Sequence, residues 1–170
     1  ARGVRQYVVL GAGFDTFAYR HAFPDLRSWE VDHPATQAVK RERLASAGIQ
    51  MPSGLSLVPV DFSRMSVEAE LASAGVDRST PVFFAWLGVS MYLDLPDVRA
   101  VFRFIGSASP GTCVVFDYAT PPESLGVMAR MMYGVMLRRL QHIGEPVKTF
   151  FEPSSGVTEL AAAGFHDSEV

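Results

Sequence analysis

Five short apolar runs, separated by stretches with helical patterning, constrain the fold of this chain more than any other feature. The first run, Gln6–Leu10, is apolar at every position after Gln6, as is typical of a strand that is buried on both faces. Strands alternating with helices predict an α/β fold with a mostly parallel sheet. The expected strands are Gln6–Leu10, Ser28–Asp32, Leu55–Phe62, Pro81–Val89 and Gly111–Tyr118.

Helix boundaries are marked by proline and glycine. Pro34 and Pro96 lie in the first turns of expected helices, and Gly48 and Gly75 follow the ends of two others. We expect a break at Gly134 in the longest helix and a lid-like role for the helical segment at about 121–150. The expected helices are Thr16–His21, Pro34–Ala47, Val67–Ala74, Leu95–Ser107, Pro121–Ile143 and Ser155–Ala163.

Composition narrows the class of protein. A chain of 170 residues with 48% apolar and 19% charged residues is typical of one globular domain, here 1–170. A net charge of −3 without a basic cluster argues against nucleic acid, and no apolar run is long enough for a membrane helix. The single Cys113 is interpreted as a buried apolar residue, and a cytoplasmic location is expected. The oligomeric state is not predicted.

The turn after the first strand is the first candidate site. Its sequence is Gly-Ala-Gly at Gly11–Gly13, and ligands of parallel sheets bind beyond the carboxyl ends of strands. Glycine permits a tight turn and lets a ligand approach the main chain. A Gly-x-Gly pair also occurs in purely structural strand-to-helix turns, so the pair alone leaves both interpretations open.

Three further residues follow strands at the same edge of the expected sheet. Asp32 ends the second strand, about 20 residues after the glycines, where a carboxylate can accept hydrogen bonds from both ribose hydroxyls. The alternatives are that Asp32 only caps the next helix or that Glu30, one pleat back, is the acid used. Asp61 and Phe62 follow the third strand, where they can border an adenine, although Asp in this position is often only a turn residue.

The turn differs from a dinucleotide-binding fingerprint, which has a third glycine three residues after the second. Asp15 and Thr16 instead occupy the helix start, where an anionic side chain repels a pyrophosphate. An NAD-linked oxidoreductase is therefore the weakest hypothesis. S-adenosylmethionine has a ribose and an adenine, no phosphate and two cationic groups, so it suits this turn better. Simple capping by Asp15 remains the structural alternative.

Six segments along the chain follow a common pattern: "VVLGAGFDTFAYR", "WEVDHPATQAVKRERL", "LVPVDF", "GVSMYL", "GTCVVFDY" and "GEPVKTFFEP". Together they resemble the leucine carboxyl methyltransferase family, in its bacterial branch that includes polyketide carboxyl O-methyltransferases. The resemblance implies a class I methyltransferase fold, Rossmann-like and three-layered, with S-adenosylmethionine as cofactor and S-adenosylhomocysteine as product. It places Gly11 and Gly13 at the methionine part, Asp32 at the ribose, and Asp61 and Phe62 at the adenine. The expected cofactor-binding set is Gly11, Ala12, Gly13, Asp15, Asp32, His33, Asp61, Phe62 and Leu87.

This sequence departs from the family pattern in three ways. Leu87 stands where relatives usually have a Glu that meets the cofactor's ammonium group. The family's N-terminal helical segment is not in this sequence, and "GFHDSEV" at the other end is interpreted as the start of a strand. We therefore expect a fold truncated at both ends. A non-catalytic methyltransferase-like interaction module is the second hypothesis.

The resemblance implies methylation of a carboxylate on a small molecule, such as a polyketide-type metabolite. A carboxylate is ionised near neutral pH and needs no general base, and no His lies in a nucleophile-activating motif. Tyr92 follows the fourth strand and is a candidate for positioning the substrate; the alternative is a packing tyrosine. One face of the expected helix carries the apolar residues Leu125, Met128, Met132 and Met136. This face is interpreted either as core packing or as part of a lid over the substrate. No metal site is expected.

Overall fold

The computed structural model describes residues 3–169, which form two compact units. The first unit is drawn from the residues up to Leu87 and from Ala108–Val115. The second is drawn from Gly88–Ser107 and from Phe116 onward. Every residue of the expected cofactor-binding set lies in the first unit, whereas Tyr92 lies in the second.

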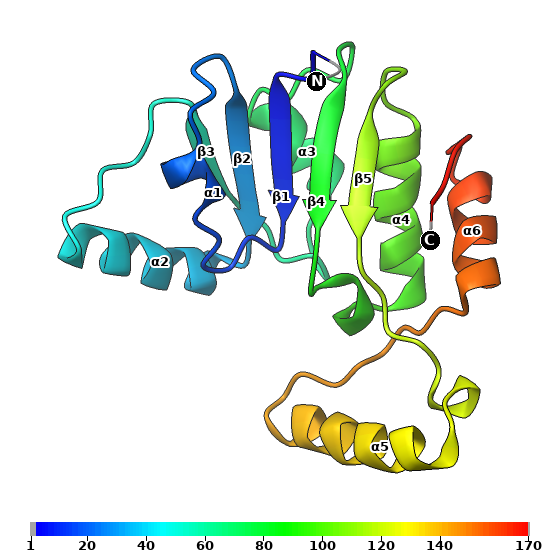
Figure 1. Ribbon diagram of the computed structural model, residues 1–170. Helices are drawn as coiled ribbons and strands as arrows, with labels where there is room; N and C mark the ends of the chain where they lie inside the picture. Colours follow the sequence, from blue (N-terminus) through cyan, green and yellow to red (C-terminus); the bar gives the residue numbers. More distant parts are fainter. Residues whose placement is uncertain (1–2, 170) are drawn as a thin grey trace. The chain divides into compact units, whose positions relative to one another are not determined.

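The sheet has five strands in the order β3-β2-β1-β4-β5 (Figure 1). Strands β1 to β4 run parallel, and the chain order reverses between β1 and β4. Val8, Leu10, Trp29, Phe84 and Trp86 have no exposed surface, which explains the apolar runs. The predicted α/β fold with a mostly parallel sheet is confirmed. The strands are β1 (Gln6–Leu10), β2 (Arg27–Asp32), β3 (Leu55–Pro59), β4 (Val82–Trp86) and β5 (Cys113–Phe116).

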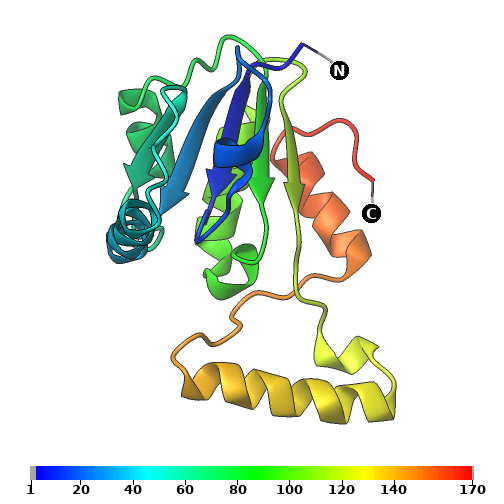
Figure 2. The ribbon, with the colours of Figure 1, turned by 60° about the vertical axis from the view of Figure 1, so that its left-hand side comes forward.

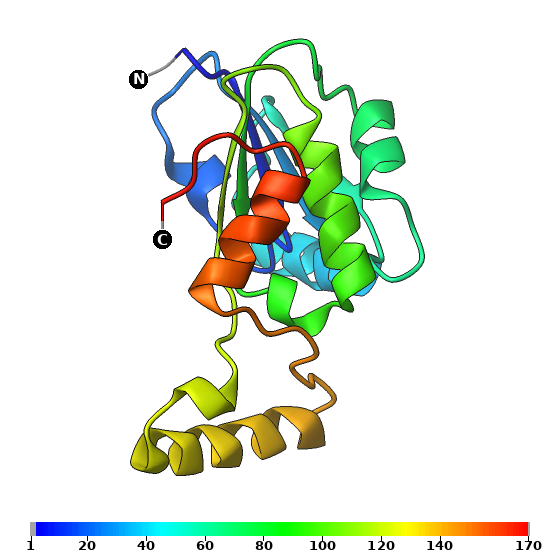
Figure 3. The same ribbon diagram turned by 90° about the vertical axis from the view of Figure 1, so that its right-hand side faces the viewer.

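Three helices belong to the first unit: α1 (Phe17–Arg20), α2 (Pro34–Ser46) and α3 (Val67–Ser73). Helices α1 and α3 lie on opposite faces of the sheet, so the sheet is the middle of three layers (Figures 1 and 3). The side chain of Ser66 caps α3, and the indole of Trp29 donates a hydrogen bond to the carbonyl of Ala74 just after it. Trp29 thereby joins β2 to the α3 layer.

The second unit contains η1 (Ser90–Tyr92), α4 (Leu95–Gly106), η2 (Pro122–Ser124), α5 (Val127–His142) and α6 (Pro153–Ala162). Helices α4 and α6 lie side by side (Figures 1 and 3). Arg99 of α4 donates two hydrogen bonds to the Glu159 carboxylate of α6, at 2.8 and 2.5 Å. The ring of Phe102 makes edge-to-face contacts with Phe116 and Phe165. The buried residues of this unit include Val98, Phe102 and Ile105 on α4 and Leu160 on α6.

The helical segment after β5 differs from the sequence prediction. A 3-10 turn precedes Leu125–Gly126, and α5 begins only at Val127. Helix α5 continues through Gly134 without a break (Figure 2), so the expected break is wrong. None of its residues is buried, and Met128 and Met132 are 74% and 71% exposed. The core-packing interpretation of this face is therefore also wrong.

Two smaller expectations are corrected. Cys113 is half-buried rather than buried, because it begins β5 at one edge of the sheet. The segment 165–169 contains no strand, since it pairs with no described strand; Val170 lies outside the described residues.

A pair of glycine substitutions tests the contact between α4 and α6. A Cβ on Gly106 would lie 2.1 Å from the carbonyl oxygen of Ala163. We expect Gly106→Ala to lower the free energy of unfolding by about 1–3 kcal/mol. A Cβ on Gly134 meets nothing within 4 Å, so we expect Gly134→Ala to raise it by about 0.4–1 kcal/mol. Urea denaturation measures both, and equal midpoints would contradict the close contact.

Candidate functional site

The carboxyl ends of four neighbouring strands bring the predicted residues together. Leu10 of β1 lies opposite Val31 of β2, so Gly11 follows beside Asp32. Val9 lies opposite Ala85 of β4, and the same register continued puts Leu87 on the other side of Gly11. Directly after β3, the amide of Val60 donates to the carbonyl of Asp32 at 2.8 Å. This edge includes the point between β1 and β4 where ligands of such sheets bind.

The Gly-Ala-Gly turn is tied to the neighbouring strand by its backbone. The amides of Gly11 and Ala12 both donate to the carbonyl of Val31, at 2.8 and 3.0 Å. Gly11 and Gly13 have φ values of 73° and 48°, which favour glycine. A Cβ on Gly13 would meet nothing within 4 Å, so the turn is open on that side. Glycine is thus required for the backbone angle, and the open side admits a ligand.

Asp32 is held in place by two backbone amides. Its Oδ2 accepts from Gly13 at 2.5 Å and its Oδ1 from His33 at 2.6 Å. A carboxylate has about four acceptor positions, two on each oxygen. Each oxygen of Asp32 therefore keeps one position for a further donor. This geometry suits the two vicinal hydroxyls of a ribose.

The side chain of His33 caps helix α2, and Asp32 accepts only from the amide of His33 itself. The His33 Nδ1 accepts from the amide of Ala35 at 3.2 Å, and Pro34 occupies the first turn. The capping contact that one alternative assigned to Asp32 is therefore made by His33, while the carboxylate of Asp32 also binds the glycine turn. The side chain of Asp32 points from β2 across to the turn that follows β1, where it binds the amide of Gly13.

Glu30, the competing acid, lies in a buried ion pair. It is 1% exposed, and its Oε2 lies 2.5 Å from the Nζ of Lys40. Burial raises the pKa of the Glu30 carboxyl, and the hydrogen bond from Lys40 opposes that rise. Because this carboxylate is enclosed and paired, Asp32 is the acid of β2 that a ligand at the carboxyl edge can reach.

Lys40 is a residue that the sequence analysis missed. It lies on α2 and is 4% exposed, and its Nζ also donates to the carbonyl of Asp15 at 2.8 Å. The sequence contains one signal that places Lys40 on the buried face of α2. Gln37 and Lys40 are three residues apart on a helix, and so share a face; Gln37 is also buried, donating to the carbonyls of Glu30 and Val58.

Asp61 follows β3 in a turn that engages half of its carboxylate. Its Oδ1 accepts from the amide and hydroxyl of Ser63, at 3.0 and 2.6 Å, and its Oδ2 lies 3.6 Å from Arg64 Nε. The hydrogen bonds from Ser63 lower the pKa of Asp61 below its ordinary value. Asp61 is therefore ionised near neutral pH, with Oδ2 as the acceptor still open. Phe62 beside it is half-buried.

Asp15 closes the turn on the α1 side. Its Oδ1 accepts from the amide of Phe17 at 2.5 Å, which satisfies one free amide at the start of α1. Helix α1 has only four residues. A capped helix of one turn, preceded by an exposed carboxylate, is a poor site for a pyrophosphate.

Leu87 and Tyr92 both follow β4 in the chain but belong to different units. Leu87 directly follows β4 and is 54% exposed, and its side chain offers no hydrogen-bond acceptor. Tyr92 is half-buried at the end of η1, in the second unit. Its proposed role beside a substrate stays a prediction.

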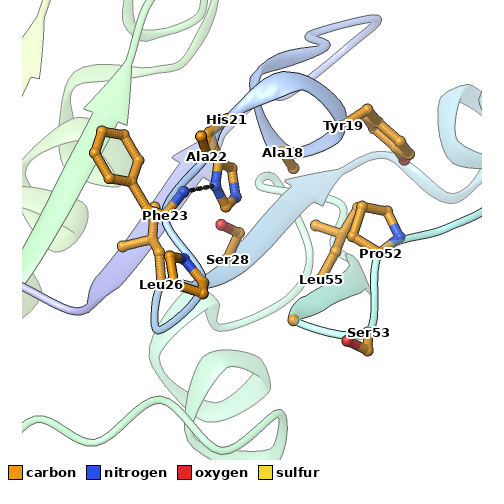
Figure 4. A pocket seen from close by; sticks show the side chains of 12 residues that line it. Ala18, Tyr19, His21, Ala22, Phe23, Leu26, Ser28, Pro52, Ser53 and Leu55 are labelled. Atoms are coloured by element: carbon orange, nitrogen blue, oxygen red, sulfur yellow. Dashed lines mark hydrogen bonds between the residues drawn. The ribbon is translucent and has the colours of Figure 1, made fainter.

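Two cavities in the first unit lie near the opposite, amino ends of the strands. One, of about 820 Å³, has a mostly apolar lining that includes Tyr7, Phe17 and Phe83. The other, of about 580 Å³, is bordered by Tyr19, His21 and Ser28, with His21 Nδ1 accepting from the amide of Phe23 (Figure 4). Neither includes Gly11, Gly13 or Asp32, so both are separate from the candidate site at the carboxyl edge.

Between residues 3 and 169, no three His, Cys, Asp or Glu side chains gather closely enough to hold a metal ion. Within the same range, no helix combines the length and apolar character needed to cross a bilayer.

A sequence profile described as leucine carboxyl methyltransferase matches residues 1–106. The chain belongs to this family. The matched segment contains the whole expected cofactor-binding set, from Gly11 to Leu87. Membership confirms the family resemblance drawn from the sequence.

Two bacterial relatives illustrate how much of a family member this chain represents. YktD of Bacillus subtilis, named as a candidate S-adenosyl-L-methionine-dependent methyltransferase, is 37% identical over 156 residues, which are 88% of this chain and 50% of YktD. A protein of Mycolicibacterium gilvum with the same kind of name is 36% identical over 120 residues, which are 68% of this chain and 38% of the relative. The chain thus spans about half or less of these relatives.

Solved structures agree on the fold. Human N-acetylserotonin methyltransferase, solved in complex with S-adenosylmethionine, superposes with a TM-score of 0.63 at 13% identity, over 96% of this chain and 42% of the human one. At this identity the likeness supports the fold alone. The class I methyltransferase architecture expected from the sequence is confirmed.

The turn at Asp61 yields a prediction about its ionisation. We expect Ser63→Ala to raise the pKa of Asp61 toward its ordinary value, because one of two hydrogen bonds to Oδ1 is removed. A lowered native pKa means that Asp61 stabilises the fold above its unfolded-state pKa and that this contribution is lost as pH falls through the native value. NMR titration of the side-chain carboxyl carbons measures the change.

A second turn of the same kind, at Asp77–Ser79, provides the control variant. The amide and hydroxyl of Ser79 donate to the Oδ1 of Asp77 as those of Ser63 do to Asp61, and the pKa of Asp77 is also lowered. Ser79→Ala should raise the pKa of Asp77 and leave that of Asp61 unchanged. An unchanged Asp61 titration in Ser63→Ala would contradict the assignment.

Proposed function

We propose that this chain carries the S-adenosylmethionine-binding core of an O-methyltransferase. The observation that supports this most directly is the hydrogen bond from the amide of Gly13 to the carboxylate of Asp32. It joins the glycine turn to an acid that keeps one free acceptor position on each oxygen. Family membership of residues 1–106 supports the same function.

The described residues fit most parts of such a cofactor. Asp32 can accept from both ribose hydroxyls, and the open Oδ2 of Asp61 can accept from the adenine amino group, with Phe62 beside the ring. The open side of Gly13 leaves room for the methionine part. Carboxylates at Asp15 and Asp32 favour a ligand that carries positive charge and no phosphate. Leu87 is the misfit, since it cannot accept from an ammonium group.

The reaction proposed is methylation of a carboxylate on a small molecule. The cofactor, when bound, supplies a methyl group on a positively charged sulfur. A carboxylate acceptor is ionised near neutral pH, so no side chain has to remove a proton. The tasks left to the chain are alignment of the acceptor and exclusion of water. This is consistent with a set of site residues that contains acids and glycines but no general base.

The acceptor is proposed to be partly apolar, as a polyketide-type metabolite is. Helix α5 presents Met128, Met131 and Met132, which are 74%, 67% and 71% exposed. Exposed methionines on one helix adapt to irregular apolar surfaces. This observation supports the lid interpretation of the segment at about 121–150, and Tyr92 remains the candidate for positioning the acceptor.

Leu87 favours a second candidate, a methyltransferase-like module that binds cofactor weakly and catalyses nothing. An exposed leucine in place of an acceptor removes one charged contact from the site. The NAD-linked alternative has no such support, because α1 is one capped turn preceded by Asp15. The two remaining candidates differ in whether an acceptor at position 87 restores tight binding.

Substitution of Asp32 tests the proposed cofactor site. We expect the chain to bind S-adenosylhomocysteine in calorimetry and Asp32→Ala to weaken that binding by about 10- to 100-fold, since hydrogen bonds to a charged group are lost. Asp25→Asn is the control, because Asp25 is exposed and pairs only with Arg5 at 3.0 Å among the contacts of the described residues. Absence of binding at millimolar ligand, or equal affinities of both variants, would overturn the proposal.

Substitution of Leu87 separates the two candidates. We expect Leu87→Glu to strengthen S-adenosylhomocysteine binding by about tenfold, because an exposed carboxylate can accept from the ligand's ammonium group. Leu87→Gln, of similar size but uncharged, should give a smaller gain. If neither variant binds better than the unmodified chain, the non-catalytic module becomes the better description.

A further inference from the structure

Lys40 is a buried cation to which the proposed cofactor chemistry gives no role. It is one of two lysines in the chain and is 4% exposed. Its ammonium donates to the carbonyl of Asp15 at 2.8 Å and to the Glu30 carboxylate at 2.5 Å. The ring of Tyr19 lies 5.5 Å from the Nζ. Three elements, the turn, β2 and α1, therefore meet at this one group.

Burying a charge pair at this place is not the simplest way to stabilise the fold. A buried ion pair loses hydration on both partners, and apolar residues of similar volume often give equal or greater stability. The pair with Glu30 alone thus gives no stability reason for a lysine. The hydrogen bond to the carbonyl of Asp15 is one that an apolar pair could not provide.

That contact completes the attachment of the glycine turn. The start of the turn is fixed by the amides of Gly11 and Ala12 on Val31, and its middle by Gly13 on Asp32. Glycines leave the backbone between these points freer than other residues would. Lys40 holds the end of the turn at Asp15, where it leads into α1.

We propose that Lys40 is a positioning residue, whose ammonium links the Asp15 carbonyl to Glu30 and so fixes the Gly11–Asp15 turn for the methionine part of the cofactor. The inference rests on the proposed function for its ligand, although the attachment of the turn does not. It assigns Glu30 the role of holding Lys40. The two acids of β2 then act differently: Asp32 contacts the nucleoside directly, and Glu30 acts only through Lys40.

Three variants of the full chain test this role. Lys40→Met removes the ammonium and leaves the carboxylate of Glu30 buried without its cation, which is strongly destabilising. The double variant Lys40→Met with Glu30→Gln removes both charges, so that folding is preserved while the contact to Asp15 is still absent. Lys148→Met is the matched control, because that lysine is exposed and pairs with Asp94.

Ligand affinity and stability are measured together. We expect the double variant to regain most of the urea midpoint that Lys40→Met loses, yet to bind S-adenosylhomocysteine about tenfold more weakly than the unmodified chain. Adenosine, which lacks the amino-acid part, should change by less than about threefold, because Asp32 and Asp61 remain in place. Lys148→Met should match the unmodified chain for both ligands.

The opposite results would overturn the assignment. Affinity for S-adenosylhomocysteine that returns with stability in the double variant would mean that Lys40 only neutralises Glu30. An equal loss for both ligands would mean a general distortion of the site. If the unmodified chain binds neither ligand, the proposed function fails, and amide hydrogen exchange then decides: faster exchange at Gly11–Phe17 in the double variant supports Lys40, and unchanged exchange contradicts it.

Discussion

The hydrogen bond between the amide of Gly13 and the carboxylate of Asp32 is the constraint around which the first unit is organised. It forms because β1 and β2 are parallel neighbours and their register places Leu10, the last residue of β1, opposite Val31. The same register places Asp61 on one side and Leu87 on the other. A slip of one residue in β2 would turn Asp32 to the opposite face and separate it from the turn.

Strand β2 has one apolar face and one face with acidic side chains, because its side chains alternate between the two faces of the sheet. Trp29 and Val31 are fully buried, and Trp29 reaches the α3 layer through its indole. Glu30 and Asp32 point the other way, toward α2 and the glycine turn. Strand β2 is paired on both sides, with β1 and β3, and this pairing gives its polar face a rigid base.

The placement of residues at strand ends was predictable from the sequence, whereas contacts between residues far apart in the chain were not. The positions of Asp32 and the glycines follow from the apolar runs, because these runs fix where each strand ends. The contacts of Lys40 do not, since its partners Asp15 and Glu30 are 25 and 10 residues away in the chain. The form of α5 was missed for a related reason: its apolar residues suggested burial, but no described element covers them.

The turns at Asp61 and Asp77 show that the same local turn forms at both edges of the sheet. Both are Asp-x-Ser segments with the same pair of hydrogen bonds to Oδ1. One follows the carboxyl end of β3, and the other precedes β4, where its backbone is held by the side chain of Gln6. A search by local pattern would rank these two turns as equals. The polarity of the sheet separates them, because the Asp61 turn alone of the two lies at the carboxyl edge, where we propose that the cofactor binds.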